Sequence, residues 1–261
     1  MLVLSKLRNI QRKPTAHLLN FSKKLILKSF GFTKTLKDRN EDNYFLTKNV
    51  FGIFDGVGGW ARSGGRSDLY SADLSKHCKA GVETKALLDP LKVLEYGFSK
   101  ADQSVRGTTT AVIASVDEKV LSVINLGDSG CLLVRNNDAV FMSSEQQHSF
   151  NYPFQIGTRS KSRPKDGDRY SFPILPGDKF LLYTDGISDN IFKKELVEHC
   201  SDNSKSIKQI ATGLVNKALE RGLDRNFVSP FQVKARMDGH NFKGGKLDDC
   251  TVVLVSVHEE K

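Results

Sequence analysis

Cysteine is scarce and long apolar runs are missing, and these two absences exclude several classes of protein. The four cysteines, Cys78, Cys131, Cys200 and Cys250, lie far apart and form no CxxC pair, and the six histidines form no HExxH motif. We therefore expect buried, reduced cysteines and no zinc site. No stretch comes near the ~18 uncharged apolar residues that a membrane span needs, so we expect no integral membrane segment.

Acidic residues are absent from the first 37 positions, which hold nine of the 39 lysines and arginines. The remaining 224 residues hold 30 basic and 30 acidic residues and are formally neutral, so the net charge of +9 belongs to the N-terminal segment. Nucleic-acid binding needs an excess of positive charge on the globular part of a protein. We therefore expect no nucleic-acid partner.

The first 35 residues combine this positive charge with leucine, isoleucine, phenylalanine, serine and threonine, a composition typical of organellar presequences. Leu18, Phe21 and Leu25 would share one face of a helix whose other face carries lysines, although Pro14 would interrupt a helix through the whole segment. We predict that residues 1–35 form a basic N-terminal segment that directs the protein to mitochondria, with the matrix as the expected compartment. A basic tail on a cytoplasmic protein is the alternative.

Residues 36–261 show no internal repeat and no low-complexity linker, so we predict a single domain. Helices come in pairs and strands come in groups with very short joints, which indicates antiparallel sheets covered by helices and an α+β fold class. The expected strands are 44–47, 50–54, 108–116, 120–126, 131–135, 139–142, 179–184 and 251–257, and the expected helices are 67–80, 91–104, 191–200 and 206–221. Residues 143–176 are expected to be loops with short strands.

Acidic residues stand at the ends of these expected strands. They are Glu41, Asp42, Asp55, Asp128, Asp185, Asp248 and Asp249, and both Asp55 and Asp185 are followed by glycine. Carboxylates that converge on one sheet edge cannot all stay ionised without cations between them, and oxygen ligands suit Mg²⁺ or Mn²⁺. Two such ions would activate a shared water for attack on a phosphoryl group. Because Asp-Gly is also a strong hairpin signal, simple turns at both places are the alternative.

Motifs of nucleotide-binding sites and of acyl-transfer enzymes offer no better interpretation of the sequence. The sequence has no GxxxxGK[ST] phosphate loop and no GxSxG nucleophile motif. Residues 56–61 fit GxGxxA, but Gly64 and Gly65 interrupt the helix that should hold a pyrophosphate, and Asp55 would repel that group. A dinucleotide site is therefore not expected.

In their order along the chain, these acidic residues resemble the motifs of the metal-dependent type-2C serine/threonine protein phosphatases. The matching motifs are RNED at 39–42, DG at 55–56, GTTTA at 107–111, NLGDS at 125–129, TDG at 184–186 and LDD at 247–249. Further motifs resemble the mitochondrial branch of this family, which is linked to coenzyme Q biosynthesis: DGVGGW at 55–60, GDSG at 127–130, EQQH at 145–148, PFQ at 153–155, SPF at 229–231 and GGKLDD at 244–249.

The resemblance implies a four-layer α-β-β-α sandwich, in which two antiparallel sheets pack face to face between helix pairs. It also implies that Asp55 bridges two Mn²⁺ or Mg²⁺ ions, with Gly56 and Glu41 as ligands of one ion and Asp185 and Asp248 as ligands of the other. Asp42 would then orient a metal-bound water. The resemblance further implies that Asp128 and Asp185 can hold a weaker third ion. The implied reaction is hydrolysis of phosphoserine and phosphothreonine in proteins by a bridging hydroxide, without a phosphoenzyme. Phosphorylated proteins are then the partners, and we expect a monomer.

Two positions depart from the family pattern. Many relatives carry a histidine in place of Val57, where it protonates the leaving alcohol, so a metal-bound water or an outside acid would have to do so here. The basic residue that grips phosphate falls on Lys37, which lacks the bidentate fork of arginine, and Arg39 is the alternative. These departures keep a pseudophosphatase that serves as a binding scaffold as the second hypothesis. A metal-dependent nuclease is a third, which the neutral domain disfavours.

Overall fold

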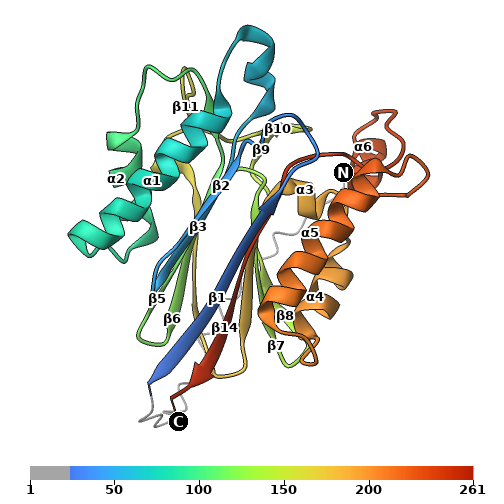
Figure 1. Ribbon diagram of the computed structural model, residues 1–261. Helices are drawn as coiled ribbons and strands as arrows, with labels where there is room; N and C mark the ends of the chain where they lie inside the picture. Colours follow the sequence, from blue (N-terminus) through green and yellow to red (C-terminus); the bar gives the residue numbers. More distant parts are fainter. Residues whose placement is uncertain (1–23, 261) are drawn as a thin grey trace, which may run out of the picture.

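The computed structural model describes residues 24–260, and two five-stranded antiparallel sheets form its centre (Figure 1). The first sheet contains, from edge to edge, β1 (Leu25–Lys34), β14 (Cys250–Glu259), β13 (Lys179–Tyr183), β7 (Gly130–Arg135) and β8 (Asp138–Met142). The second sheet contains β12 (Asp168–Pro173), β6 (Val120–Leu126), β5 (Ala111–Asp117), β3 (Val50–Asp55) and β2 (Asp42–Leu46). In two short ladders, β4 (Thr108–Thr109) pairs with β11 (Ile156–Gly157), and β9 (Gln147–Ser149) pairs with β10 (Tyr152–Pro153).

Helices cover the outer face of each sheet (Figure 1). The helices α1 (Ser67–Lys85) and α2 (Pro90–Lys100) pack on the second sheet, and α4 (Lys193–Ser201) and α5 (Ile207–Leu223) pack on the first. The connecting segments hold α3 (Asp185–Ser188), α6 (Pro230–Met237) and the 3₁₀ helices η1 (Gly58–Ser63) and η2 (Pro164–Asp166). This arrangement confirms the predicted α+β class and the four-layer α-β-β-α sandwich.

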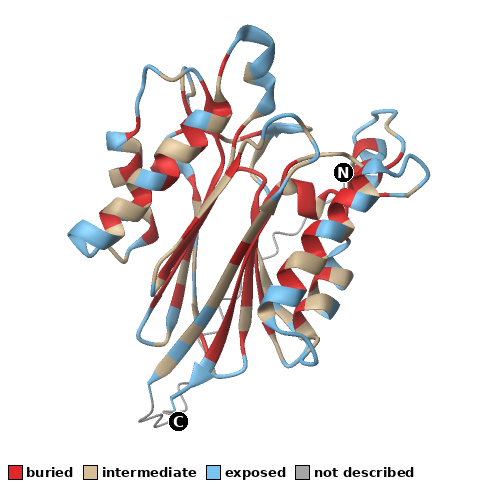
Figure 2. Ribbon diagram, in the orientation of Figure 1, coloured by how far each residue is buried: buried red, intermediate tan, exposed pale blue. Residues whose placement is uncertain are grey.

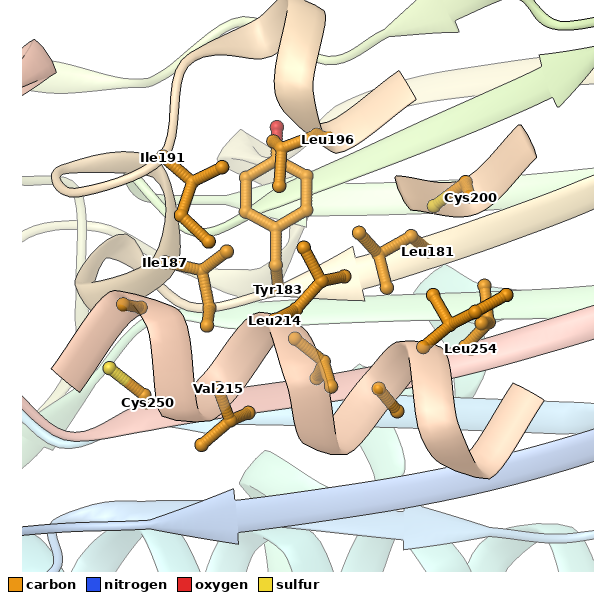
Figure 3. Close-up of a cluster of buried hydrophobic side chains, with 14 of the residues drawn as sticks. Leu181, Tyr183, Ile187, Ile191, Leu196, Cys200, Leu214, Val215, Cys250 and Leu254 are labelled. Carbon is orange, nitrogen blue, oxygen red and sulfur yellow. The ribbon is translucent and has the colours of Figure 1, made fainter. Parts of the chain in front are cut away.

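Three apolar cores hold the four layers together. The central core lies between the two sheets, where the rings of Phe51 and Phe180 meet edge to face. The second core joins the first sheet to α4 and α5 around Leu214 (Figure 3), and the third joins the second sheet to α1 and α2 around Tyr70. Because both faces of the inner strands are covered, β5 is buried at every position from 111 to 116 instead of alternating. Figure 2 shows this burial along the strands and on the helix faces that turn toward them.

Side-chain caps begin the helices at defined residues. Asp89 accepts hydrogen bonds from the backbone N–H groups of Leu91 and Lys92, and Pro90 occupies the first helical position of α2. Ser206 accepts a hydrogen bond from the N–H of Gln209 and starts α5 in the same way. Each cap satisfies N–H groups of the first helical turn that have no partner within the helix.

The predicted strands and helices are all present, with 108–116 divided into β4 and β5. The elements that were not predicted are β1, α3, α6 and the 3₁₀ helices η1 and η2, whereas β9, β10, β11 and β12 fall in the stretch 143–176 that was expected to hold short strands. All four cysteines are buried and free, as expected. Among residues 24–260, no helix is long and apolar enough to cross a membrane.

Strand β1 changes the N-terminal boundary of the domain. Its ten residues pair with β14 from Leu25↔Glu259 to Lys34↔Cys250, so residues 25–34 belong to the sheet although the prediction places them in a targeting segment. Leu25 and Leu27 pack against the central core, and Phe30 and Phe32 pack against the core under α5, which is the two-faced pattern of a strand in a covered sheet. Lys28 and Lys34 lie on the same face as the two phenylalanines and are exposed. Leu25 is therefore in a strand and not on a helical face. Leu18 and Phe21 lie outside the described residues, and mitochondrial targeting stays a prediction.

Candidate active site

The strand ends bring the predicted acidic residues to one edge of the sandwich. Asp42 begins β2 and Asp55 ends β3, and because these strands are antiparallel the two residues are direct partners in the ladder. Asp128 lies in the short connection between β6 and β7, and Asp185 follows β13, whose last residue pairs with the first residue of β7. Topology thus places carboxylates that are far apart in sequence beside one another.

Asp55, Asp128 and Asp185 form the centre of this acidic cluster. Each of the three offers a carboxylate oxygen, and these oxygens all lie within 4.8 Å of one another. The backbone around Asp55 is fixed to the neighbouring strand, because Thr110 donates its N–H to the Asp55 carbonyl at 2.9 Å. An all-oxygen donor set at this spacing fits Mg²⁺ or Mn²⁺.

Neither Asp-Gly pair is a hairpin turn. Gly56 continues from β3 in a single bridge to Thr109, and a Cβ atom there would lie 2.7 Å from the carbonyl oxygen of Glu41. Gly186 lies in α3, where a Cβ atom would collide with the carbonyl oxygen of Asp249. Both glycines are needed because backbone segments of the site pass close to them, which favours the metal interpretation over the turn alternative.

Two buried carboxylates beside the centre each keep one oxygen without a partner. Asp42 is 4% exposed, and its Oδ2 accepts a hydrogen bond from the Thr184 hydroxyl at 2.9 Å, whereas its Oδ1 has no hydrogen-bond partner. Asp249 is 2% exposed, and its Oδ2 accepts the N–H of Glu41 at 3.0 Å, whereas its Oδ1 is likewise unpartnered. Buried oxygens are normally satisfied, so these two fit a site completed by cations and their waters.

The electrostatics of the cluster also require cations. Burial raises the pKa of Asp42, with Asp249 adding to the effect, and burial raises the pKa of Asp55, with Asp185 and Asp42 adding. Burial and Asp185 together raise the pKa of Asp128. Carboxyl groups in this position ionise together at neutral pH only when positive charge lies between them.

Two lysines supply part of that charge. The Lys37 ammonium group lies 2.8 Å from Asp248 Oδ1 and 2.9 Å from Asp249 Oδ2. The Lys246 ammonium group lies 2.6 Å from Asp185 Oδ2, 2.8 Å from Asp189 Oδ2 and 3.2 Å from Asp248 Oδ2. Burial lowers the pKa of each lysine, but the adjacent carboxylates outweigh burial and the pKa of both is raised, so both are cations.

A cavity of about 1060 Å³ opens over the cluster. Its lining includes four acids, four basic residues and several apolar or aromatic ones: Asp55, Asp128, Asp185, Asp248, Lys37, Lys246, Arg159, Lys161, Gly56, Val57, Trp60, His148 and Tyr152. The Trp60 indole N–H donates to the Thr108 hydroxyl at 2.8 Å, which ties η1 to β4 and fixes one wall. A cavity of this volume is as large as the binding sites of small-molecule ligands.

The structure brings most of the predicted site residues together. Lys37, Asp55, Gly56, Asp128, Asp185 and Asp248 line the cavity, and Glu41 and Asp42 lie directly behind it. Arg39 is exposed and is not part of the lining, so Lys37 is the better candidate for the phosphate-binding base. Two participants were missed by sequence reasoning, Asp189 and Lys246. Asp189 follows Asp185 by one helical turn, and Lys246 precedes Asp248 by two positions. Their closeness in sequence to these predicted ligands was the signal that could have identified them.

Known proteins resemble this chain over most of its length. The protein phosphatase 2C family matches residues 28–151. The human "Protein phosphatase PTC7 homolog" is 36% identical over 230 residues, which are 81% of this chain and 76% of the human protein. The Arabidopsis thaliana "Probable protein phosphatase 2C 55" is 34% identical over 229 residues, and the chain spans about half the length of this relative and of a second one from that plant, at 49% and 53%.

A solved structure shares the fold over nearly its whole length. The X-ray structure of the photosystem II phosphatase PBCP superposes with a TM-score of 0.82 at 25% identity, and the match covers 88% of this chain and 98% of that one. The match extends well beyond the acidic motifs and includes both sheets and their helices.

Proposed function

The chain belongs to the protein phosphatase 2C family, and on this premise we propose that it hydrolyses phosphoserine and phosphothreonine in proteins with two Mn²⁺ or Mg²⁺ ions. The observation that carries the proposal is the trio Asp55, Asp128 and Asp185, whose oxygens lie within 4.8 Å of one another on the floor of a large open cavity. Two unpartnered buried oxygens, on Asp42 and Asp249, support the presence of cations there.

The chain's own residues divide into ligands and positioning groups. We propose that Asp55 and the Gly56 carbonyl hold one ion with help from Glu41, that Asp55 and Asp185 hold the other with Asp248, and that Asp42 positions water. The ions, when bound, supply activation of a water nucleophile and neutralise the phosphoryl oxygens. Lys37, which lines the cavity, adds a positive charge for the incoming phosphate.

Nothing in the described part of the cavity lining offers a cysteine nucleophile. Cys250, which follows the acidic pair at 248–249, is buried, and burial together with Asp42 and Asp248 raises its pKa. A thiolate is therefore not formed at neutral pH, and we propose direct hydrolysis without a phosphoenzyme. Val57 lines the cavity but has no ionisable proton, so we propose that the leaving alcohol takes its proton from water or from an acid elsewhere.

The proposed setting is the mitochondrial matrix. The basic composition of the N-terminal residues and the resemblance of motifs such as GGKLDD to the mitochondrial branch support it. Imaging of a tagged full-length chain beside one that lacks residues 1–23 tests this placement. Mitochondrial signal from the first and diffuse signal from the second are expected, and diffuse signal from both would overturn it.

The function is tested by phosphate release from phosphoserine and phosphothreonine peptides. The full chain is freed of metal with a chelator and assayed before and after addition of Mn²⁺ or Mg²⁺, with a phosphodiester as the comparison substrate. We expect release from the phosphopeptides only after the ion is added, and no cleavage of the diester. A protein that binds the ions and stays inert toward every phosphomonoester would contradict the proposal and would support the scaffold hypothesis instead.

A further inference from the structure

Lys246 is the most enclosed cation of the acidic cluster. Its side chain is 17% exposed, and its ammonium group contacts three carboxylates, those of Asp185, Asp189 and Asp248, at 2.6 to 3.2 Å. The same ammonium group lies 5.0 Å from the centre of the Phe231 ring. A cation with three carboxylates and an aromatic face around it is coordinated much as an inorganic ion would be.

The backbone places this lysine firmly. The buried side chain of Asn190 accepts the Lys246 N–H at 3.0 Å and donates to the Lys246 carbonyl at 2.7 Å. Gly245 directly before it donates its N–H to the Asp224 carbonyl at 2.9 Å, and a Cβ atom on Gly245 would collide with the carbonyl of Arg221. The fold therefore holds the ammonium group in one position, whereas the side chain of a free surface lysine moves among many.

Asp189 has both of its oxygens engaged by lysines. Its Oδ2 contacts Lys246 at 2.8 Å, and its Oδ1 contacts Lys234 at 3.5 Å. Lys234 in turn lies 2.5 Å from Glu145, which belongs to the segment between β8 and β9. Asp189 is 4% exposed, so no water shell competes for these oxygens. On this side of the cluster, ammonium groups engage both oxygens of Asp189, an acid that is not among the proposed ligands of the two ions.

We propose that Lys246 is an internal cation that takes the place of a third divalent ion beside Asp185, Asp189 and Asp248, so that the cluster binds two ions and not three. The inference rests on the proposed two-ion site, and it replaces the weaker third ion that the sequence resemblance implies for Asp128 and Asp185. An ammonium nitrogen at 2.6 to 2.8 Å from two of these carboxylates fills the volume in which an ion and its waters would lie. It also keeps Asp185 and Asp248 in place with a single charge.

The test is a count of bound Mn²⁺ per full-length chain, by equilibrium dialysis and elemental analysis. Wild type should bind two ions, and Lys246→Met should bind three, with the additional ion binding more weakly than the first two. Lys243→Met is the matched control, because Lys243 is exposed in the same loop, and it should bind two. Three ions in wild type, or two in a folded Lys246→Met protein, would overturn the proposal.

Further variants keep the test decisive. If Lys246→Met does not fold, Lys246→Gln replaces it with the same expected count of three. The double variant Lys246→Met/Asp189→Asn should return to two ions, and a count of three there would show that the additional ion is not held by Asp189 and would refute the proposal. A wild-type chain that binds no Mn²⁺ contradicts the proposed two-ion function itself, so the two failures are distinguishable.

Discussion

Removal of strand β1 is the perturbation whose cost the structure defines most clearly. Its four larger inward apolar residues, Leu25, Leu27, Phe30 and Phe32, are half-buried against the cores on the two faces of the first sheet. Full burial of such a side chain stabilises a protein by about 1.5 to 3 kcal/mol, so four half-buried ones contribute about 3 to 6 kcal/mol. A whole domain is stable by only about 5 to 15 kcal/mol. The chain without β1 should therefore be close to unfolding.

Two truncated chains isolate this contribution. One lacks residues 1–23 and keeps β1, and the other lacks residues 1–35 and loses it. For a domain of this size, each kcal/mol shifts the melting temperature by about 2 to 4 °C, so the second chain should melt about 6 to 24 °C below the first in circular dichroism. It should also aggregate, because β14 would become an edge strand with unpaired backbone groups.

Equal melting temperatures for the two chains would refute the assignment of β1 to the folded domain. The expected result also limits processing. If an N-terminal segment is removed in the cell, the cut must fall before Leu25, because a cut after residue 35 would take β1 with it. N-terminal sequencing of protein recovered from cells reads this position directly.

Two further predictions concern stability. The Arg221 guanidinium donates hydrogen bonds to Glu195 and lowers the pKa of Glu195 to about 2 from 4.5, so the stabilisation is complete above pH 4.5 and is lost as the pH falls through about 2. Glu195→Gln should therefore lower the free energy of unfolding by about 1 to 2 kcal/mol at pH 7, after allowance for solvent screening. An equally large loss in urea unfolding near pH 2 would contradict this prediction. Gly213→Ala should stabilise α5 by about 0.5 to 1 kcal/mol, because open space surrounds the new methyl group. Gly186→Ala should destabilise the protein by about 1 to 3 kcal/mol, because the new methyl group would collide with the carbonyl oxygen of Asp249. A shift of the melting temperature in the same direction for both variants would refute this prediction.

The sequence was sufficient for the layers of the fold because local and long-range signals agree. The grouping of strands, the pairing of helices and short joints such as 136–138 all indicate the same sandwich. Strand β1 was missed because its exposed lysines and apolar residues also suit an amphipathic helix, and only pairing with β14, more than 200 residues away, decides between the two. Pairing at such a distance leaves no local pattern.

The acidic residues of the site could be predicted because each stands next to an expected strand end, and because Asp55 and Asp185 are each followed by glycine. The roles of the lysines could not. Whether Lys37 or Arg39 faces the cavity depends on how the chain turns after β1, and Lys246 enters the cluster through its backbone contacts with Asn190, which is 56 positions away. Burial by distant segments converts a loop lysine into an internal cation, and sequence spacing alone does not show that burial.

The most direct measurement is single-turnover hydrolysis of a phosphothreonine peptide by Asp55→Asn in the presence of Mn²⁺. Loss of the shared ligand should cost at least about 4 kcal/mol of transition-state stabilisation, which is a rate lower by about 10³-fold. The matched control is Asp117→Asn, at the far end of β5, which should keep the wild-type rate. The metal-free Asp55→Asn protein should stay folded, because the change removes repulsion from Asp185 and Asp42. A folded Asp55→Asn protein that hydrolyses the peptide at the wild-type rate would contradict the account.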